Sequence, residues 1–376
     1  MSDEERLARV ALSRLTEPGE PKIASLTTQL GAVRLLEHLT NPEQDTPEAR
    51  DVATRLGTID PQQELDRAQR LGLRYLIPGD DEWPTQVDDL HRAELLEHRG
   101  GPPLGLWVAG PTRLDELGHA VAVVGARSAT TYGSEIAAGI ASTLVRAGHP
   151  VVSGAAYGID QAAHRGALAV EGANVAVLAC GADRSYPTAH HDLLEHLRRT
   201  SAVVSEVPPG CAPMRTRFLS RNRLIAALGR GTVVVEAAAR SGALNTASWT
   251  TRLNRQLMGV PGPVTSAQSQ GVHELLRTGA ANLVTRGEDV LELVAESGAY
   301  LAPTPRAPTR RRDRVPPRDQ RVLDAVPVAR AAPVDSIAST AGMALLEVQA
   351  ALGRLARDEL VELMPRGWRL APAANE

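Results

Sequence analysis

The residues best suited to bind a polyanion lie in a stretch without Asp or Glu that runs from Val207 to Val235. The stretch holds several arginines, with one aromatic and one amide side chain among them: Arg215, Arg217, Phe218, Arg221, Asn222, Arg223 and Arg230. Guanidinium groups contact phosphates while a base stacks on an aromatic ring, so this composition favours a single nucleic-acid strand. Alternatively, Phe218 anchors the segment to the core and the arginines form a solvated face.

Two glycine-containing turns follow the first two predicted strands of the central region. The first contains Gly125 and Arg127, and the second contains Ser153, Gly154 and Gly158. At the carboxyl edge of a parallel sheet, such turns point backbone N–H groups and helix N-termini outward, which favours an anion site. Neither turn has the G-x-G-x-x-G fingerprint, so NAD is not expected. Alternatively, the glycines only permit tight strand-to-helix turns.

Three titratable residues beside these turns are candidates for supporting roles. Asp160 and His164 are four residues apart on one predicted helix and face the same side, so we expect a structural hydrogen bond between them. An acid–base pair and a metal site are the alternatives. Glu236 ends a predicted strand and is placed to orient an arginine or a sugar hydroxyl, or to act as a general base. No histidine or cysteine spacing predicts a metal site, and we expect no cofactor.

An alternation of apolar runs and helical segments must position these residues. The predicted strands are Val121–Val124, Val151–Val152, Val175–Leu178, Val203–Val204, Val233–Val235 and Gly259–Val260. The predicted helices between them are Ser134–Ala147, Ile159–Val170, His190–Arg198, Arg221–Leu228 and Leu244–Leu253. Strands that are apolar on both faces and alternate with helices predict an α/β domain with a mostly parallel sheet, doubly wound and Rossmann-like.

The chain divides into four predicted parts. Residues 1–76 have helical spacing, as in SAM or helix-hairpin-helix modules, and their lack of a basic hairpin favours a packing or partner role over DNA binding. Residues 77–298 form the extended Rossmann-like domain. Residues 299–318 are rich in Pro and Arg and predict an extended linker. Residues 319–376 predict a winged-helix domain of three helices and a hairpin.

The third helix of that last domain is the one that would read DNA. Its charges, Glu347, Arg354, Arg357 and the following Asp358, cancel, which favours a protein contact over DNA.

Composition limits the function classes. The chain has 376 residues, of which 43% are hydrophobic and 23% charged, which excludes a disordered chain and a membrane bundle. Its formal net charge is −3, so any polyanion site must be a local patch. The two cysteines, Cys180 and Cys211, fit a reducing compartment, and the acidic start is unlike a signal peptide. We therefore expect a soluble cytoplasmic protein.

The chain resembles the DprA/Smf family of bacterial DNA-processing proteins over about residues 79 to 295. The segments that carry the resemblance include Val124-Gly125-Ala126-Arg127, Ser153-Gly154, Gly158-Ile159-Asp160, Ala163-His164, Tyr186-Pro187, Phe218 to Ala226, Val235-Glu236-Ala237 and Ser241-Gly242-Ala243-Leu244. The resemblance implies a homodimer that binds single-stranded DNA. It also implies protection of incoming strands, help in loading the RecA recombinase and relief of the block by single-strand-binding protein during natural transformation.

The resemblance also implies roles for individual residues. Arg127 and Arg215 resemble phosphate contacts, and Phe218 resembles the base-stacking residue. The expected DNA-binding set is Gly125, Arg127, Ser153, Gly154, Arg215, Phe218, Arg221, Asn222, Arg223, Ser241 and Gly242, supported by Asp160, His164 and Glu236.

Three positions depart from the family pattern. Tyr157 stands where the family has an Arg, His190 and His191 lie where an Asn is usual, and Arg215 is often a Lys.

A non-enzymatic DNA-binding protein is the leading interpretation. A nucleotide hydrolase of the phosphoribohydrolase type would need a carboxylate three residues after Thr246, where this chain has Trp249.

Overall fold

The computed structural model describes residues 2–40, 47–296, 298–300 and 311–375, in two compact units, Met1–Ala302 and Pro303–Glu376. Among these residues no helix is both long and apolar enough to cross a membrane. Residues 301–310, half of the predicted linker at 299–318, lie outside the described residues. The last part of the linker is described: Arg311–Arg314 form a short 3₁₀ helix, and the next helix begins at Pro317.

The described part of the first unit contains one nine-stranded sheet with the order β1-β2-β6-β5-β4-β3-β7-β8-β9. Its strands are β1 (Leu73–Leu76), β2 (Leu106–Ala109), β3 (Val121–Val124), β4 (Val151–Ser153), β5 (Asn174–Leu178), β6 (Ala202–Ser205), β7 (Gly231–Val234), β8 (Gln256–Gly259) and β9 (Asn282–Leu283). Neighbours from β6 to β9 are parallel, which confirms the predicted mostly parallel sheet. The antiparallel strands β1 and β2 at the β6 edge were not predicted.

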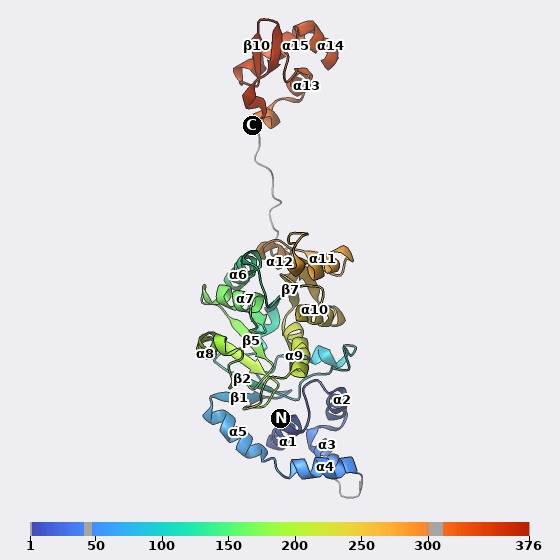
Figure 1. Ribbon diagram of the computed structural model, residues 1–376, viewed down its shortest axis with the longest axis vertical. Helices are drawn as coiled ribbons and strands as arrows, with labels where there is room; N and C mark the ends of the chain where they lie inside the picture. The colour runs from blue at the N-terminus through green and yellow to red at the C-terminus, as the bar shows by residue number, and fades with distance from the viewer. Residues whose placement is uncertain (1, 41–46, 297, 301–310, 376) are drawn as a thin grey trace. The chain divides into compact units, whose positions relative to one another are not determined.

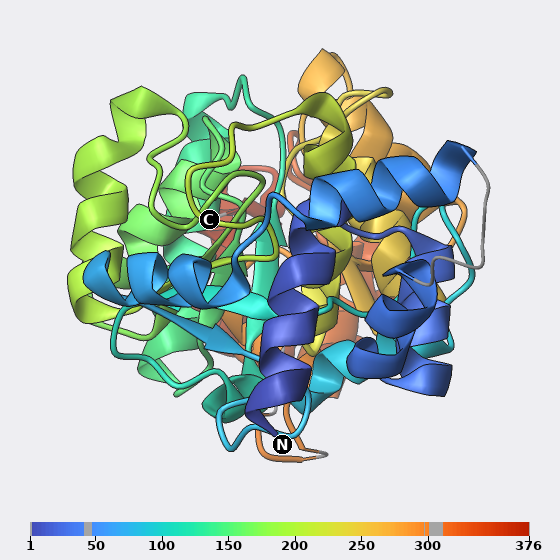
Figure 2. The same ribbon diagram turned by 90° about the horizontal axis from the view of Figure 1, so that it is seen from below.

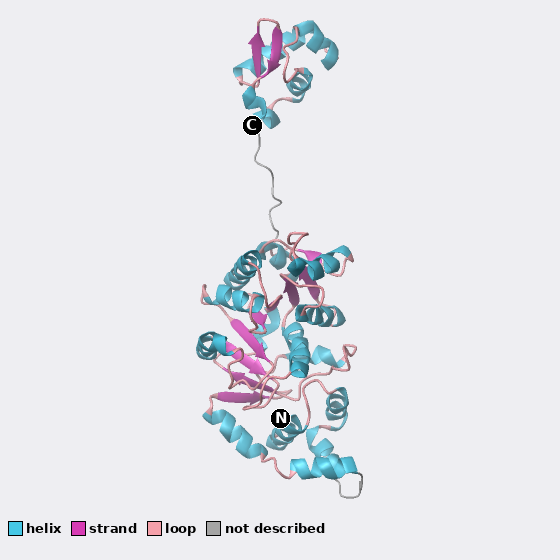
Figure 3. Cartoon of the chain, in the orientation of Figure 1, coloured by secondary structure: helices cyan, strands magenta, loops and turns pink. Residues whose placement is uncertain are grey.

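Helices cover both faces of this sheet, because successive side chains of a strand point to opposite sides. Val121 and Val123 of β3 pack against α6 (Thr131–Arg146), α7 (Ile159–Leu168) and α12 (Gly287–Val294). Ala122 and Val124 face the opposite core, which contains α9 (Arg215–Leu228), α10 (Gly242–Arg252) and α11 (Gln270–Arg277). Figures 1 and 3 show these two helical layers, with α8 (His191–Thr200) beside β5.

The N-terminal helices lie at the β1 end of the sheet, as Figure 1 shows, and they stand at the front of the view in Figure 2. They are α1 (Asp3–Leu15), α2 (Pro21–Leu30), α3 (Ala32–Thr40), α4 (Pro47–Leu56) and α5 (Pro61–Arg70). Ser2 caps α1 by accepting a hydrogen bond from the Glu5 amide, and Arg6 forms an ion pair with Asp80 of the core at 2.7 Å. The predicted boundary at residue 76 therefore falls inside the first unit, after a strand of its sheet.

The described part of the second unit contains three α-helices and a hairpin. The helices are α13 (Pro317–Ala325), α14 (Val334–Ala341) and α15 (Leu345–Arg357), and the strands are β10 (Val361–Met364) and β11 (Gly367–Leu370). Gly342 ends α14 in the left-handed conformation, with φ of +64°. Val322, Ile337, Leu352 and Leu355 are among the residues of its own apolar core.

Candidate nucleic-acid interface

The strand order of the sheet reverses at β3. From β3 the chain proceeds outward through β4, β5 and β6, then returns through α9 to β7 on the other side of β3. In open α/β sheets, ligands bind at such a switch point, beyond the carboxyl ends of the strands. A groove of about 1050 Å³ lies there, lined by the turn after β3, the first half of α9 and the N-terminus of α10.

The groove brings together most of the predicted DNA-binding set. Its lining includes Gly125, Arg127, Arg215, Phe218, Arg221, Asn222, Ser241 and Gly242. Asp160 also lines it, as does Glu97, an exposed carboxylate that the sequence analysis did not select. Ser153, Gly154, Arg223, His164 and Glu236 are not part of the lining.

Phe218 is the centre of an aromatic and cationic cluster in this groove. The guanidinium carbon of Arg127 lies 5.1 Å from the centre of the Phe218 ring, and that of Arg221 lies 5.8 Å from it. The ring of Tyr186 is 5.7 Å away and tilted by 52°. Tyr186 lines the groove and is 41% exposed, so a second aromatic surface is available for stacking. The sequence analysis quoted Tyr186-Pro187 as a motif but assigned Tyr186 no role.

Arg221 places a buried positive charge at the wall of the groove. Its Nη1 donates hydrogen bonds to the carbonyl of Gly154 at 2.7 Å and to that of Val177 at 2.6 Å. Its Nε donates to the amide oxygen Oδ1 of Asn222. Among the described residues, no carboxylate lies within ion-pair distance of Arg221. Burial lowers the pKa of Arg221 to about 10, opposed by the charge of Asp160, so the side chain stays cationic at neutral pH. A cation in this state favours an anionic ligand.

The other arginines of the acid-free stretch differ in availability. Arg215 and Arg127 are exposed, and within the described ranges neither forms an ion pair. Arg217 instead binds Glu17 of the α1–α2 turn through two hydrogen bonds of 2.7 Å. The acid-free stretch is therefore partly neutralised by a carboxylate far away in sequence.

Arg223 does not fit the direct DNA contact expected of it. Its side chain is fully buried, and its Nη1 and Nη2 donate to the Glu206 carboxylate at 2.8 and 2.7 Å. The reason is helical geometry: two residues after Arg221, the chain has turned away from the groove. Arg223 therefore belongs to the core.

The backbone amides of the second turn are already occupied by a carboxylate. Asp160 Oδ2 accepts hydrogen bonds from the amides of Gly154 at 3.2 Å and Ala156 at 3.3 Å. The expected Asp160–His164 hydrogen bond is wrong, because His164 Nδ1 lies 2.6 Å from Asn174 Oδ1. Both side chains therefore stabilise the scaffold.

Glu236 has a similar role at the first turn. Its carboxylate accepts from the amide of Thr130 at 3.0 Å and from its hydroxyl at 2.5 Å, at the N-terminus of α6. Within the described ranges it forms no hydrogen bond or ion pair with an arginine, which was one of the roles expected for it. The charge of Glu236 compensates the positive end of the α6 dipole, so this helix start offers little to an external anion.

At two of the predicted DNA-binding glycines, neighbouring side chains leave no room for a Cβ atom. A Cβ on Gly154 would lie 2.3 Å from Arg221 Nη1, and one on Gly125 would lie 2.6 Å from Ile159 Cγ1. Any larger residue at Gly154 would displace Arg221. The two glycines thus leave room for the side chains of Arg221 and Ile159.

Of the departures from the family pattern, Arg215 lines the groove, whereas Tyr157, His190 and His191 do not. Tyr157 is exposed, does not line the groove, and its ring centre is 4.8 Å from that of His190. His190 is buried, and its Nδ1 lies 2.9 Å from the carbonyl oxygen of Ala155. The imidazole therefore supports the second turn, while His191 lies 3.2 Å from the Ser185 hydroxyl.

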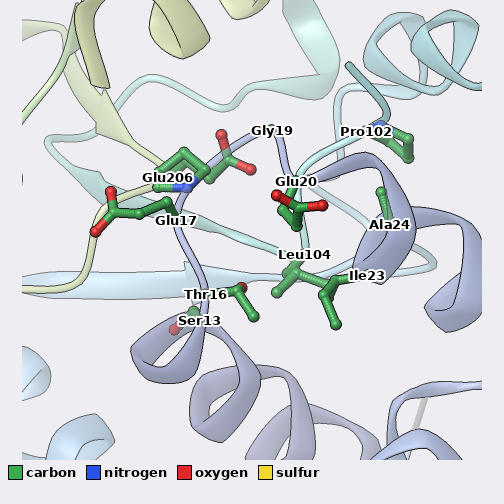
Figure 4. Close-up of a pocket in the computed structure, with 11 residues that line it drawn as sticks. Ser13, Thr16, Glu17, Gly19, Glu20, Ile23, Ala24, Pro102, Leu104 and Glu206 are labelled. Atoms are coloured by element: carbon green, nitrogen blue, oxygen red, sulfur yellow. The ribbon is translucent and has the colours of Figure 1, made fainter. Parts of the chain in front are cut away.

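A second cavity, drawn in Figure 4, lies between the α1–α2 turn and the core. Glu17, Gly19 and Glu206 are among its lining residues, and its volume is about 20 Å³. That is enough space for one water molecule and too little for a nucleotide. In the described part of the chain, no group of three or more His, Cys, Asp or Glu side chains is arranged to hold a metal ion.

Comparison with known proteins identifies the family of this chain. The family model for DNA recombination-mediator protein A matches residues 74–295. A relative from Mycobacterium tuberculosis, whose name includes DprA, is 41% identical over 376 residues, which cover 99% of this chain and 96% of the relative. The DNA processing protein DprA of Streptococcus pneumoniae is 35% identical over 276 residues, which cover 72% of this chain and 94% of that protein.

Two solved structures are similar as well. That of DprA from Streptococcus pneumoniae has a TM-score of 0.65 and 28% identity, covering 78% of this chain and 99% of that one. That of DNA processing protein A from Helicobacter pylori, described for its single-stranded DNA binding mode, has a TM-score of 0.51 and 26% identity, covering 58% of this chain and 94% of that one. The chain therefore belongs to the DprA/Smf family of DNA-processing, recombination-mediator proteins.

Proposed function

We propose that this chain binds single-stranded DNA, without catalysis, in the groove at the switch point of the sheet. The observation that carries this proposal is the cluster around Phe218, where the guanidinium carbons of Arg127 and Arg221 lie 5.1 and 5.8 Å from the centre of the same ring. Aromatic rings that accept bases, next to cations that accept phosphates, are the combination that binds single strands with little sequence preference.

A strand in this groove uses three kinds of contact. Arg127 and Arg215, which are exposed and not ion-paired in the described structure, take phosphates at the rim. Arg221 supplies a fixed charge at the wall, where burial strengthens its attraction to a phosphate. Phe218 and Tyr186 stack on bases, and each stack contributes about 1–3 kcal/mol by alanine substitution. Ser241 and Gly242 lie where the exposed N-terminus of α10 adds a favourable dipole.

The finer parts of the proposal rest on family membership and on the architecture of the two units. We infer an extended, doubly wound Rossmann-like domain and a C-terminal winged helix joined by the Pro/Arg-rich linker. We infer a cytoplasmic homodimer that protects incoming single strands, assists RecA loading and acts against single-strand-binding protein during natural transformation. The description of the Helicobacter pylori relative as a single-strand binder supports the DNA ligand.

The enzymatic alternative has no support in the geometry. At the spacing where a phosphoribohydrolase would have its carboxylate, Trp249 is buried in the core beside α9. Asp160 and Glu236, two acids at the carboxyl edge of the sheet, are both engaged with backbone amides.

The test is fluorescence anisotropy with a labelled dT oligomer and a duplex of equal length, across a salt series. The wild type is expected to prefer the single strand. In Arg215→Ala, the slope of log affinity against log salt is expected to fall by about 0.7, the value for one single-strand phosphate contact.

Arg230→Ala is the matched control, because Arg230 is exposed and in the same acid-free stretch but does not line the groove. Equal affinity for strand and duplex in the wild type would overturn the function. Equal losses in the Arg215 and Arg230 variants would overturn the site alone.

A further inference from the structure

A two-residue turn, Glu97-His98, lies at the rim of the groove. On either side of the turn, Leu96 and Arg99 form an antiparallel bridge, in which the amide of each residue donates to the carbonyl of the other at 2.9 Å. Leu96 and Glu97 line the groove, and Glu97 and His98 are exposed. The turn therefore places a carboxylate at the edge of the region where we propose that a strand binds.

The backbone of this turn is strained at both central residues. Glu97 has φ of +50° and His98 has φ of +62°, in the left-handed region that favours glycine. Two-residue hairpin turns with positive φ at both positions usually contain Asn-Gly or Gly-Gly. In the described part of the chain, neither side chain forms a hydrogen bond or an ion pair that would compensate this strain. Such strain is retained chiefly at functional sites.

Contacts at its base hold the turn in place. Leu96 packs against the apolar core that contains α9, and the amide of Gly100 donates to the carbonyl of Gly19 at 3.1 Å. A Cβ at Gly100 would lie 2.4 Å from Leu95 Cδ2, so the segment is closely packed there. The carboxylate of Glu97 is thus carried by a backbone that has little freedom to move away from the groove.

The charge of Glu97 is opposite to that of most charged side chains around it. Among the described residues, the groove is lined by four arginines and two acids: Arg127, Arg215, Arg221, Arg240, Asp160 and Glu97. Asp160 accepts hydrogen bonds from two backbone amides, whereas Glu97 accepts none within the described ranges. Because a free carboxylate repels phosphates, Glu97 weakens the binding of a nucleic-acid backbone at this rim.

This repulsion acts differently on a single strand and on a duplex. A single strand is flexible, so its phosphates can lie on the arginines while its bases turn toward Phe218 and Tyr186. A duplex carries about one charge per 1.7 Å of its axis, twice the density of one of its strands. It is also stiff over about 150 base pairs, so it cannot rearrange its phosphates around a fixed negative charge. The same carboxylate therefore opposes a duplex more than a single strand.

We propose that Glu97 is a specificity-determining residue, which disfavours duplex DNA by holding a negative charge at the rim of the groove. This role rests on the proposed binding of single strands in that groove. It accounts for a strained turn that holds an unpaired carboxylate beside a site for a polyanion.

The test compares the affinities of the full chain for a labelled dT oligomer and for a duplex of equal length, by fluorescence anisotropy at low salt. Glu97→Gln is expected to raise duplex affinity by about threefold, the size of one exposed charge interaction, and single-strand affinity by less than about 1.5-fold. The gain in duplex affinity should shrink as the salt concentration rises, because exposed charges are screened.

Two further variants separate the carboxylate from its surroundings. Glu94→Gln is the matched control for loss of a negative charge, because Glu94 is exposed, lies three residues away and does not line the groove. His98→Asn keeps the carboxylate and places a residue that tolerates positive φ in the turn. Both variants are expected to keep the wild-type ratio of single-strand to duplex affinity.

The outcomes distinguish this role from the proposed function. A wild-type ratio in Glu97→Gln, or equal changes in Glu97→Gln and Glu94→Gln, would overturn the role of Glu97 and leave single-strand binding standing. A lower ratio in His98→Asn would assign the discrimination to the shape of the turn and would also overturn the role of the carboxylate. Equal affinity of the wild type for strand and duplex would overturn the proposed function, and the role of Glu97 with it.

Discussion

Helices α9 and α15 are nearly equal in length, with 14 and 13 residues, but they present opposite surfaces. The first nine residues of helix α9 include four arginines, each in a different environment. Arg215 is exposed, and Arg217 forms an ion pair with Glu17. Arg221 is buried with no ion pair in the described structure, and Arg223 is buried in an ion pair with Glu206. Helix α15 has two arginines, and two leucines are exposed at its start. Arginine content therefore says little about binding until burial and partners are known.

The difference follows from how each helix meets its sheet or bundle. Helix α9 crosses from β6 back to β7, so Ser220 to Leu228 are buried on all sides and must accommodate two arginines. Helix α15 contacts its unit on one side only, which leaves a full face to solvent. Substitutions on the two helices should consequently affect different properties.

The largest expected effect is on stability, from Arg223→Met. This variant leaves Glu206 buried without its counter-charge, which costs about 3–5 kcal/mol of unfolding free energy. Urea denaturation measures it. The double variant Arg223→Met with Glu206→Gln should recover much of the loss, and Arg357→Ala on α15 should change stability by less than about 0.5 kcal/mol. A small effect of Arg223→Met would mean that the buried pair contributes little.

The next effect is on affinity, from Phe218→Ala. Loss of the stacking ring should weaken binding of a dT oligomer by about 1–3 kcal/mol, with an unchanged salt slope because no phosphate contact is removed. Anisotropy titration measures both quantities. Leu346→Ala on α15 is the matched apolar truncation and should leave single-strand affinity unchanged. If it weakens binding as much as Phe218→Ala does, the contrast between the two helices is lost.

The smallest expected effect is on the pH dependence of the two units. Burial holds the pKa of His164 in the first unit below its ordinary value of 6.5, so the folded state favours the neutral ring. The stability from this preference is fully present above pH 6.5 and is lost as the pH falls below it. In the second unit, the hydrogen bond from Arg354 lowers the pKa of Asp319 below 3.8, so that contribution is lost only as the pH falls below about 3.8.

Thermal unfolding followed by tryptophan fluorescence measures both pH windows, since Trp368 is in the second unit and Trp83, Trp107 and Trp249 are in the first. Each group contributes at most about 1.4 kcal/mol per pH unit, the limit for one proton. His164→Asn should flatten the first window and Asp319→Asn the second. A pH dependence of the first unit that is identical in His164→Asn would contradict the assignment.

Most of the fold and the centre of the site could be predicted from the sequence. β-Branched runs such as Val121–Val124 are apolar on both faces, and such strands require helices on both sides. The edge strands β1 and β2 were missed because each has only four residues, and Leu73–Leu76 was counted with the helical region despite the turn at Gly72. Tyr186 was missed because its proximity to Phe218 joins segments 32 residues apart.

What the sequence determined by itself is the alternation of strands and helices from β3 to β8, the acid-free arginine stretch around Phe218 and the glycine turns that follow β3 and β4. These depend on local residue type and spacing. What only the tertiary structure decided is which charges remain available: Glu17 and Glu206 neutralise Arg217 and Arg223, while Arg221 stays buried without an ion pair. The physical reason is that electrostatic interaction depends on distance and burial, and both are set by contacts between residues remote in sequence.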